Sequence, residues 1–297
     1  MKSKTFIGCL CALSCEVLFG LSYVFTKKVT GTAGEFELLG WRFFTAFLVM
    51  TILVITGSVK INLKGKKIKS LLLVALFSPV IYFIGETVGI ANTSASESGV
   101  FLACIPVVSL VASSMILKKK PTKWQSVGIA ITLIGVLVTV FAAGASANLS
   151  VTGYIFLTIA VISYALYSVF VEKTSEFTEA EITYVQLCAG ALVFVVTALI
   201  KGFANGTAYE LIALPFGNPH FLIAILYQGI GCSILAFFMS NAAITRIGVN
   251  RTSSFIGAST VVSILAGMLI LGEPFSLMRF VGAIIIIAGI YTANIGK

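Results

Sequence analysis

Residues 70–91 read SLLLVALFSPVIYFIGETVGIA, an apolar run that contains one charged residue, Glu86. A helix of about 20 apolar residues crosses the hydrocarbon core of a bilayer, which is about 30 Å thick. Similar runs recur along all 297 residues, which are 58% hydrophobic and only 10% charged, whereas soluble chains carry roughly 25% charged residues. The sequence therefore predicts an all-α polytopic membrane protein. A β-barrel is excluded, because its strands do not give unbroken apolar runs.

Ten spans are expected, joined by short connections rich in glycine, asparagine and proline. They cover approximately residues 6–26, 36–57, 70–91, 95–117, 124–143, 151–171, 181–200, 219–245, 249–271 and 276–295. The stretch 201–218 is expected to be the longest loop. The N-terminal run resembles a signal peptide, but it is too long for a cleaved one and is interpreted as a retained first span.

Lysine and arginine residues orient the chain. With the N-terminus in the cytoplasm, fifteen of the twenty fall on the inner side and four on the outer side, while Arg42 lies within a span. By the positive-inside rule, both termini of this cell-membrane protein are expected in the cytoplasm. The same bias accounts for the net charge of +9, so nucleic-acid binding is not inferred. The expected partners are the lipid bilayer and a small-molecule substrate.

Neither a metal site nor a cofactor is predicted. The six cysteines all lie in apolar runs without metal-ligand spacing, and they are interpreted as small packing residues. His220 is the only histidine of the chain. One histidine cannot form a metal site, and no catalytic role is assigned to any residue.

A faint internal repeat relates the two halves of the chain. Met115 and Pro121 match Met268 and Pro274, in both cases 153 residues later. A further alignment sets Arg42 opposite Gln186. Because a repeat of five spans is odd-numbered, the second copy must enter the membrane the other way up, as in transporters whose substrate site lies between inverted repeats. The predicted division is residues 1–148 and 149–297.

At these residues the chain resembles the EamA family of the drug/metabolite transporter superfamily, over essentially its whole length. The resemblance is carried by Leu271-Gly272-Glu273-Pro274 with Gly282 and Gly289, by Gly20-Leu21-Ser22, by Trp41-Arg42-Phe43 and by Thr93-Ser94-Ala95-Ser96. It implies a ten-helix secondary transporter with a central cavity that opens alternately to each side. In the first half, Lys118-Lys119-Lys120-Pro121 replaces the usual Gly-Glu-x-Pro, so no role is transferred from Glu273 to that loop.

Ionisable residues inside spans are candidate site residues, because each costs at least about 2.5–3.5 kcal/mol to insert. They are Glu16, Arg42 and Glu86, with Glu97 near a span edge. Helical spacing places Glu86 on one polar stripe and Glu16 on another, and both stripes are expected to face a cavity. The stripes are Ser78, Tyr82, Glu86, Gly89 and Thr93, and Glu16, Gly20, Tyr23 and Lys27.

Two interpretations of Glu86 stay open: it binds a cationic substrate group or a coupling proton, or it pairs with Arg42 as a structural carboxylate. Arg42 itself also fits the helix-packing pattern of the resembling family. Five further polar residues either line the cavity or form interhelical hydrogen bonds; they are Tyr82, Tyr164, Tyr167, Gln186 and Gln228.

The function expected from the sequence is secondary active transport of small metabolites across the cytoplasmic membrane, by alternating access. Export of amino acids or related small polar or cationic compounds is the favoured form, with proton coupling left open. The alternatives are an uptake carrier for a cationic metabolite and an intramembrane enzyme acting on lipid, although no catalytic constellation is visible. A channel would need a filter motif that the sequence lacks. Both a monomer and a homodimer fit the sequence.

Overall fold

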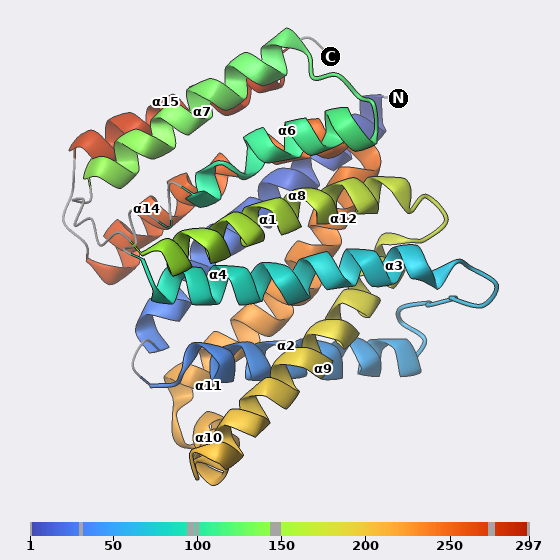
Figure 1. Ribbon diagram of the computed structural model, residues 1–297, viewed down its shortest axis with the longest axis vertical. Helices are drawn as coiled ribbons and strands as arrows, with labels where there is room; N and C mark the ends of the chain where they lie inside the picture. The colour runs from blue at the N-terminus through green and yellow to red at the C-terminus, as the bar shows by residue number, and fades with distance from the viewer. Residues whose placement is uncertain are drawn as a thin grey trace.

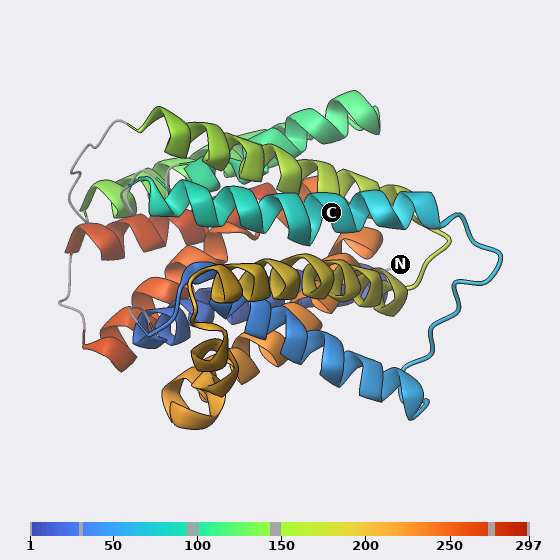
Figure 2. The same ribbon diagram turned by 60° about the horizontal axis from the view of Figure 1, so that its bottom comes forward.

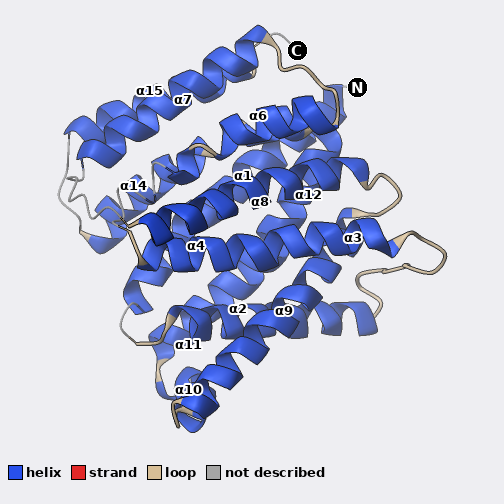
Figure 3. Cartoon of the chain, in the orientation of Figure 1, coloured by secondary structure: helices blue, strands red, loops and turns tan. Residues whose placement is uncertain are grey.

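The computed structural model describes residues 2–29, 32–93, 98, 101–142, 150–272 and 277–295. In this part of the chain the elements are helices joined by short connections (Figure 3). The first half contains α1 (Lys2–Val29), α2 (Glu35–Ile55), α3 (Ile68–Ala75), η1 (Leu76–Ile81), α4 (Tyr82–Ala91), α6 (Ile105–Ile116) and α7 (Lys123–Ala142). The second contains α8 (Val151–Lys173), α9 (Glu179–Ala204), α10 (Ala208–Gly217), α11 (Pro219–Leu226), η2 (Tyr227–Ala236), α12 (Phe237–Ile247), α13 (Val249–Ser253), α14 (Gly257–Leu271) and α15 (Leu277–Ala293).

Among the described residues, eight helical segments are long and apolar enough to cross a membrane, so this is a multi-pass membrane protein. Two shorter apolar helices, Phe101–Ile116 and Leu277–Ala293, fall where the fourth and tenth spans are expected. The all-helical prediction is confirmed. Glu97, Glu273 and Pro274 lie outside the described residues.

The expected loop at 201–218 is wrong, because α9 continues to Ala204 and α10 fills most of the rest. Its glycine and proline residues mark helix ends. Gly206 takes a positive φ of 72° in the turn between the two helices, a conformation that glycine adopts without steric cost. Pro215 lies in the last turn of α10, where it cannot donate a hydrogen bond to the Leu211 carbonyl. That carbonyl accepts a hydrogen bond from Trp41 Nε1 instead (2.9 Å).

The helices pack in pairs that join distant parts of the chain (Figures 1 and 2). α7 lies against α15 at one edge of the bundle, and α2 lies against α9 towards the opposite edge. Between them, α1 packs on α12 and α14, while α8 packs on α4 and α6. Both termini lie at the same end of the bundle as the connection between α6 and α7, whereas α14 ends and α15 begins at the other end.

Close backbone contact between α7 and α15 depends on glycine. A Cβ atom on Gly135 would lie 2.8 Å from the Gly282 carbonyl oxygen, and one on Gly282 would lie 2.8 Å from the Gly135 oxygen. A Cβ on Gly289 would lie 2.7 Å from the Gly128 oxygen. Burial of apolar surface does not drive helices together in a membrane, because the lipid tails are equally apolar. Association depends instead on close packing, which small residues allow.

The helix over 68–91 is interrupted near its centre. Proline excludes the helical conformation at the preceding residue, and Ser78, before Pro79, has an extended backbone (φ −142°, ψ 120°). Carbonyls freed by such a break need partners inside a membrane. The Phe77 carbonyl accepts a hydrogen bond from Ser163 Oγ (2.8 Å), and the Ser78 carbonyl accepts one from Gln186 Nε2 (2.9 Å).

Aromatic rings form a core beside this break. Phe43 packs against Phe83, Phe194 and Phe237, with ring centroids 5.2–6.2 Å apart. These rings come from α2, α4, α9 and α12, and all four are buried. They fix the positions of the helices that carry the polar residues described next.

Candidate functional site

Five of the expected site residues form one group inside the bundle, the central polar cluster. Its members are Glu16 on α1, Arg42 on α2, Tyr82 and Glu86 on α4, and Tyr164 on α8. Tyr82 hydrogen-bonds to Glu86 (2.7 Å) and packs edge-on against the Tyr164 ring (centroids 5.5 Å apart), and the charges of Arg42 and Glu16 lie near this group. The structure thus brings together charges that are far apart in the sequence.

A hydroxyl lies close to each carboxylate of the cluster. Tyr82 donates a hydrogen bond to Glu86 Oε1 (2.7 Å), whereas the Ser259 hydroxyl of α14, which lies near Glu16, donates to the Ile256 carbonyl (2.7 Å). Glu16 is buried, whereas Glu86 and Tyr82 are half-buried. Glu86 thus shares the surroundings of Tyr82, whose ring packs against Tyr164 of α8.

Arg42 does not form an ion pair with Glu86, although the two interact electrostatically. Its Nε donates to Ser233 Oγ on η2 (2.7 Å). The guanidinium carbon lies 4.7 Å from the centroid of the Phe83 ring and 5.6 Å from that of Phe43. One of its two terminal nitrogens, Nη2, is buried without a hydrogen-bond partner in the part of the chain that the structure describes.

Tyr167 and Gln186 belong to a neighbouring buried network, which touches the cluster where the Tyr167 ring packs edge-on against Tyr164 (centroids 5.5 Å apart). Tyr167 donates to Asn241 Oδ1 (2.7 Å), and Asn241 Nδ2 donates to Gln186 Oε1 (2.8 Å) and to Thr183 Oγ1 (3.1 Å). Gln186 in turn holds the Ser78 carbonyl at the helix break. The side-chain amides of Gln186 and Asn241 are both hydrogen-bonded to groups on other helices of the protein, which indicates an interhelical role.

Gln228 lies apart from both groups. Its Nε2 donates to Thr26 Oγ1 on α1 (3.0 Å), and the side chain is buried. This contact joins η2 to the end of α1. The side chains of Tyr23 and Lys27, on the expected stripe of the first span, are outside the described part of the structure.

Sequence reasoning missed the neutral partners of the site. Ser233 and Asn241 bond to Arg42 and Gln186, respectively, and Ser259 lies near Glu16. Small polar residues recur throughout transmembrane helices, so composition alone does not distinguish these three. Only the packing of the helices identifies them, because each lies on a helix that packs against the helix of its charged or amide neighbour.

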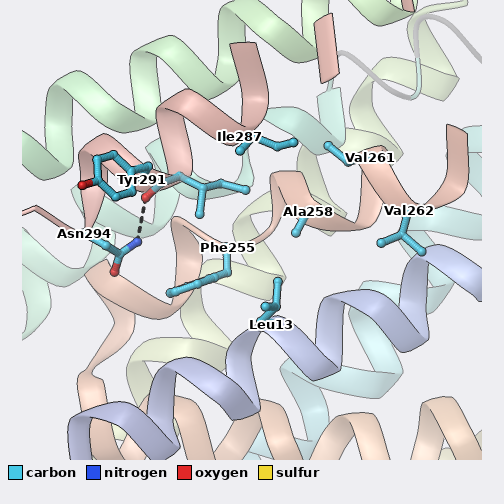
Figure 4. Close-up of a pocket in the computed structure, with 9 residues that line it drawn as sticks. Leu13, Phe255, Ala258, Val261, Val262, Ile287, Tyr291 and Asn294 are labelled. Carbon is cyan, nitrogen blue, oxygen red and sulfur yellow. Dashed lines mark hydrogen bonds between the residues drawn. The ribbon is translucent and has the colours of Figure 1, made fainter. Parts of the chain in front are cut away.

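A second feature is an apolar pocket of about 380 Å³ between α1, α14 and α15 (Figure 4). Leu13, Phe255, Ala258 and Ile287 point into it, and Asn294 and Tyr291 lie at one side. None of the expected site residues lines this pocket. It is distinct from the central polar cluster.

Three ion pairs gather at the end of the bundle where both termini lie. Lys66 Nζ lies 2.6 Å from Glu181 Oε2, Lys119 pairs with Glu172, and Arg246 Nη1 lies 2.6 Å from Glu179 Oε1. The first two pairs join residues from opposite halves of the chain. Glu172 also accepts a hydrogen bond from the backbone nitrogen of Val249 at the start of α13 (2.7 Å).

The chain matches one protein family twice. The EamA-like transporter family matches over residues 6–141 and again over residues 151–295. These two ranges together cover most of the chain.

Similar proteins extend this finding. The "Uncharacterized transporter YcxC" of Bacillus subtilis (strain 168) is 32% identical over 288 residues, which are 96% of this chain and 92% of that protein. The "Probable amino-acid metabolite efflux pump" of Salmonella typhimurium (strain LT2) is 22% identical over 187 residues, 62% of each chain. A solved structure titled "Crystal structure of protein" has the same fold, with a TM-score of 0.76, 17% identity and coverage of 99% of this chain and 98% of that one.

Proposed function

The chain belongs to the EamA-like transporter family, and we propose that it is a secondary transporter that exports amino acids or related small polar or cationic compounds by alternating access. Its relatives are transporters and not enzymes, so the intramembrane-enzyme alternative is dropped. The observation that carries the proposal is the central polar cluster, whose charged side chains lie inside an apolar bundle.

The proposed architecture is ten transmembrane helices in two inverted five-helix repeats, residues 1–148 and 149–297, around a central cavity. The packing pattern supports it. Exchanging the halves turns the α1 contacts with α12 and α14 into the α8 contacts with α4 and α6, and it maps the α2–α9 and α7–α15 pairs onto themselves. The turn after α6 and the end of α14 also lie at opposite ends of the bundle (Figure 1), as inversion requires.

A π-helical segment recurs in both halves. The third span of each proposed half carries one, η1 at Leu76–Ile81 and η2 at Tyr227–Ala236, and η1 is also broken at Ser78. Interrupted helices at corresponding positions of two repeats are common at transporter substrate sites. The central polar cluster lies beside both segments, since Tyr82 follows η1 and Arg42 bonds to Ser233 of η2.

In this proposal Glu86 binds either a cationic group of the solute or a coupling proton. Its partial exposure inside the bundle supports access for both. Charged groups within a membrane mark substrate and proton pathways, because their insertion is otherwise too costly. Amino-acid export is supported by the similarity to the Salmonella protein, which is named as a probable amino-acid metabolite efflux pump.

The proposed orientation places both termini in the cytoplasm, from the positive-inside bias. The ion pairs Lys66–Glu181 and Lys119–Glu172 then close the cytoplasmic end between the halves. Opening to the cytoplasm separates them. A single cysteine introduced in the 58–69 or 118–123 loop should be protected from an impermeant reagent in intact cells, and labelling there from outside would overturn this orientation.

Counterflow in proteoliposomes tests the transport proposal. Purified protein is reconstituted with an unlabelled solute inside, and uptake of the same labelled solute is followed over time. We expect transient accumulation for at least one amino acid, because a carrier exchanges solutes across the membrane. The panel also contains polyamines, choline-like cations and nucleobases, and absence of counterflow for the whole panel would contradict the proposal.

A further inference from the structure

Arg42 is a cation held in place with part of its hydrogen-bonding capacity unused. It is 7% exposed, its Nε is occupied by Ser233, and its plane is set against the Phe83 ring. Nη2 has no partner among the described residues. A buried charged donor without a partner is costly, because it has given up water and gained nothing in exchange.

No carboxylate of the described chain fills this role. Glu86 accepts a hydrogen bond from the Tyr82 hydroxyl, and neither Glu86 nor Glu16 is hydrogen-bonded to Arg42 Nη2. Glu172, Glu179 and Glu181 are engaged in ion pairs at one end of the bundle. The guanidinium therefore faces the interior with a free donor, and a carboxylate lies nearby without touching it.

We propose that Arg42 is a specificity residue that binds the carboxylate of the transported solute through Nη2, while Glu86 faces its ammonium group. The substrate class is then a zwitterion with both groups close together, as in an α-amino acid. This inference rests on the proposed transport function. It adds that the anionic group of the solute is required, which cationic metabolites and neutral bases do not satisfy.

The chemistry of the two side chains fits this assignment. A planar guanidinium prefers carboxylates, because its nitrogens match the spacing of the two oxygens. The aromatic face of Phe83 and the Ser233 bond fix the plane of the group, so little conformational freedom is lost when the anion binds. Two opposite charges that are close but not in contact can be bridged by one zwitterion.

The test compares matched solutes on the wild-type protein. Each of the twenty standard amino acids is tested singly for inhibition of counterflow and for a rise in melting temperature of the purified protein. For each amino acid that acts, its carboxamide and its decarboxylated amine are then measured. We expect both analogues to bind about 10- to 100-fold more weakly, since each removes a charged hydrogen-bond partner of Arg42.

Variants then assign the effect to Arg42. Arg42→Gln should bind the amino acid and its carboxamide within about threefold of each other, and Arg42→Lys should retain part of the preference because it keeps the charge. Arg251→Gln is the matched control, because Arg251 Nε also donates to a neutral side chain, Asn294 Oδ1 (2.8 Å), outside the central polar cluster. It should keep the wild-type preference.

The outcomes separate the two proposals. Equal binding of acid, carboxamide and amine by the wild type would overturn the inference, even if Arg42→Gln fails to fold. An unchanged preference in a folded Arg42→Gln variant would also overturn it, as would counterflow confined to polyamines, choline-like cations or nucleobases; in all these cases the transport function stands. Absence of counterflow for every solute would contradict both proposals.

Discussion

Arg42 and Gln186 occupy matching positions in the proposed repeats, but their surroundings differ. Each reaches the irregular segment of the opposite half, Arg42 through Ser233 of η2 and Gln186 through the Ser78 carbonyl of η1. Gln186 completes a paired network with Asn241. Arg42 keeps a buried nitrogen without a partner in the described chain.

This difference indicates how a nearly symmetric scaffold acquires an asymmetric site. The second-half position satisfies the backbone of a broken helix, which a membrane protein must do. The first-half position leaves a charged donor free beside Glu86. In our proposal, one copy of the position serves structure and the other serves recognition of the solute.

The largest effect is expected from breaking the symmetric contact itself. In Gly135→Val, the new side chain would meet the Gly282 carbonyl oxygen at 2.8 Å and the backbone nitrogen of Ile286 at 2.7 Å. A backbone obstacle cannot rotate away, so we expect little folded protein in size-exclusion chromatography. Gly217→Val is the control, since a Cβ there meets nothing within 4 Å. Normal yield and melting temperature for Gly135→Val would contradict the α7–α15 packing.

Glu86→Gln tests the carboxylate that we propose faces the ammonium group of the solute. The variant keeps the size of the side chain and can still bond to the Tyr82 hydroxyl, but it loses the negative charge. We expect counterflow to fall by about 100-fold or more, from the loss of a buried charge interaction.

The folded state of Glu86→Gln should change little, because no ion pair with Arg42 is broken. Had Glu86 served only to neutralise Arg42, the melting temperature would fall, at a cost of roughly 3–5 kcal/mol for a stranded buried charge. Glu210→Gln is the control, since Glu210 is exposed on α10. A stable Glu86→Gln protein with wild-type counterflow at every pH would refute both interpretations of this residue.

Asn241→Ala probes the structural side. It leaves Gln186 Oε1 without the Asn241 amide, and it leaves the Tyr167 hydroxyl with only the longer bond to Ser240 Oγ (3.3 Å). Each buried polar group left unpaired costs about 1–3 kcal/mol, so the melting temperature should fall while counterflow per folded molecule is largely retained. If transport were lost without any loss of stability, the network would belong to the substrate site and the comparison would fail.

Lys66→Gln should have the smallest effect on stability. Lys66 pairs with Glu181. Glu181 is buried, but its carboxylate also accepts hydrogen bonds from the backbone nitrogens of Asn62 and Thr178. It therefore keeps partners when Lys66 is replaced, and we expect a loss of about 1 kcal/mol. The measurement reports on conformation. We expect a cysteine introduced at a buried position near this end to react faster with a thiol reagent in Lys66→Gln than in the wild type, because the ion pair helps to keep this end of the bundle closed. An unchanged reaction rate would remove the ion pairs from the alternating-access account.

The sequence predicted the helical membrane fold and the residues of the central polar cluster, because both depend on local composition. Charge in an apolar span is visible without a structure, as at Glu16 and Glu86. The partners were not visible, since Ser233 and Asn241 are ordinary polar residues until packing places them beside Arg42 and Gln186. The helix α10 was missed because Gly206 and Pro215 serve at helix ends, where the same residues also favour loops.

The most direct test of the central claim measures melting temperature and counterflow on Arg42→Gln and Gln186→Leu, purified side by side. We expect the free energy of unfolding of Arg42→Gln to stay within about 1 kcal/mol of the wild-type value, since the substitution removes an unpaired buried donor. The variant should also lose the preference for solutes with a carboxylate. Gln186→Leu should melt lower and keep the wild-type preference per folded molecule. The reverse pattern, or the same pattern in both variants, would contradict the division of roles between the two halves.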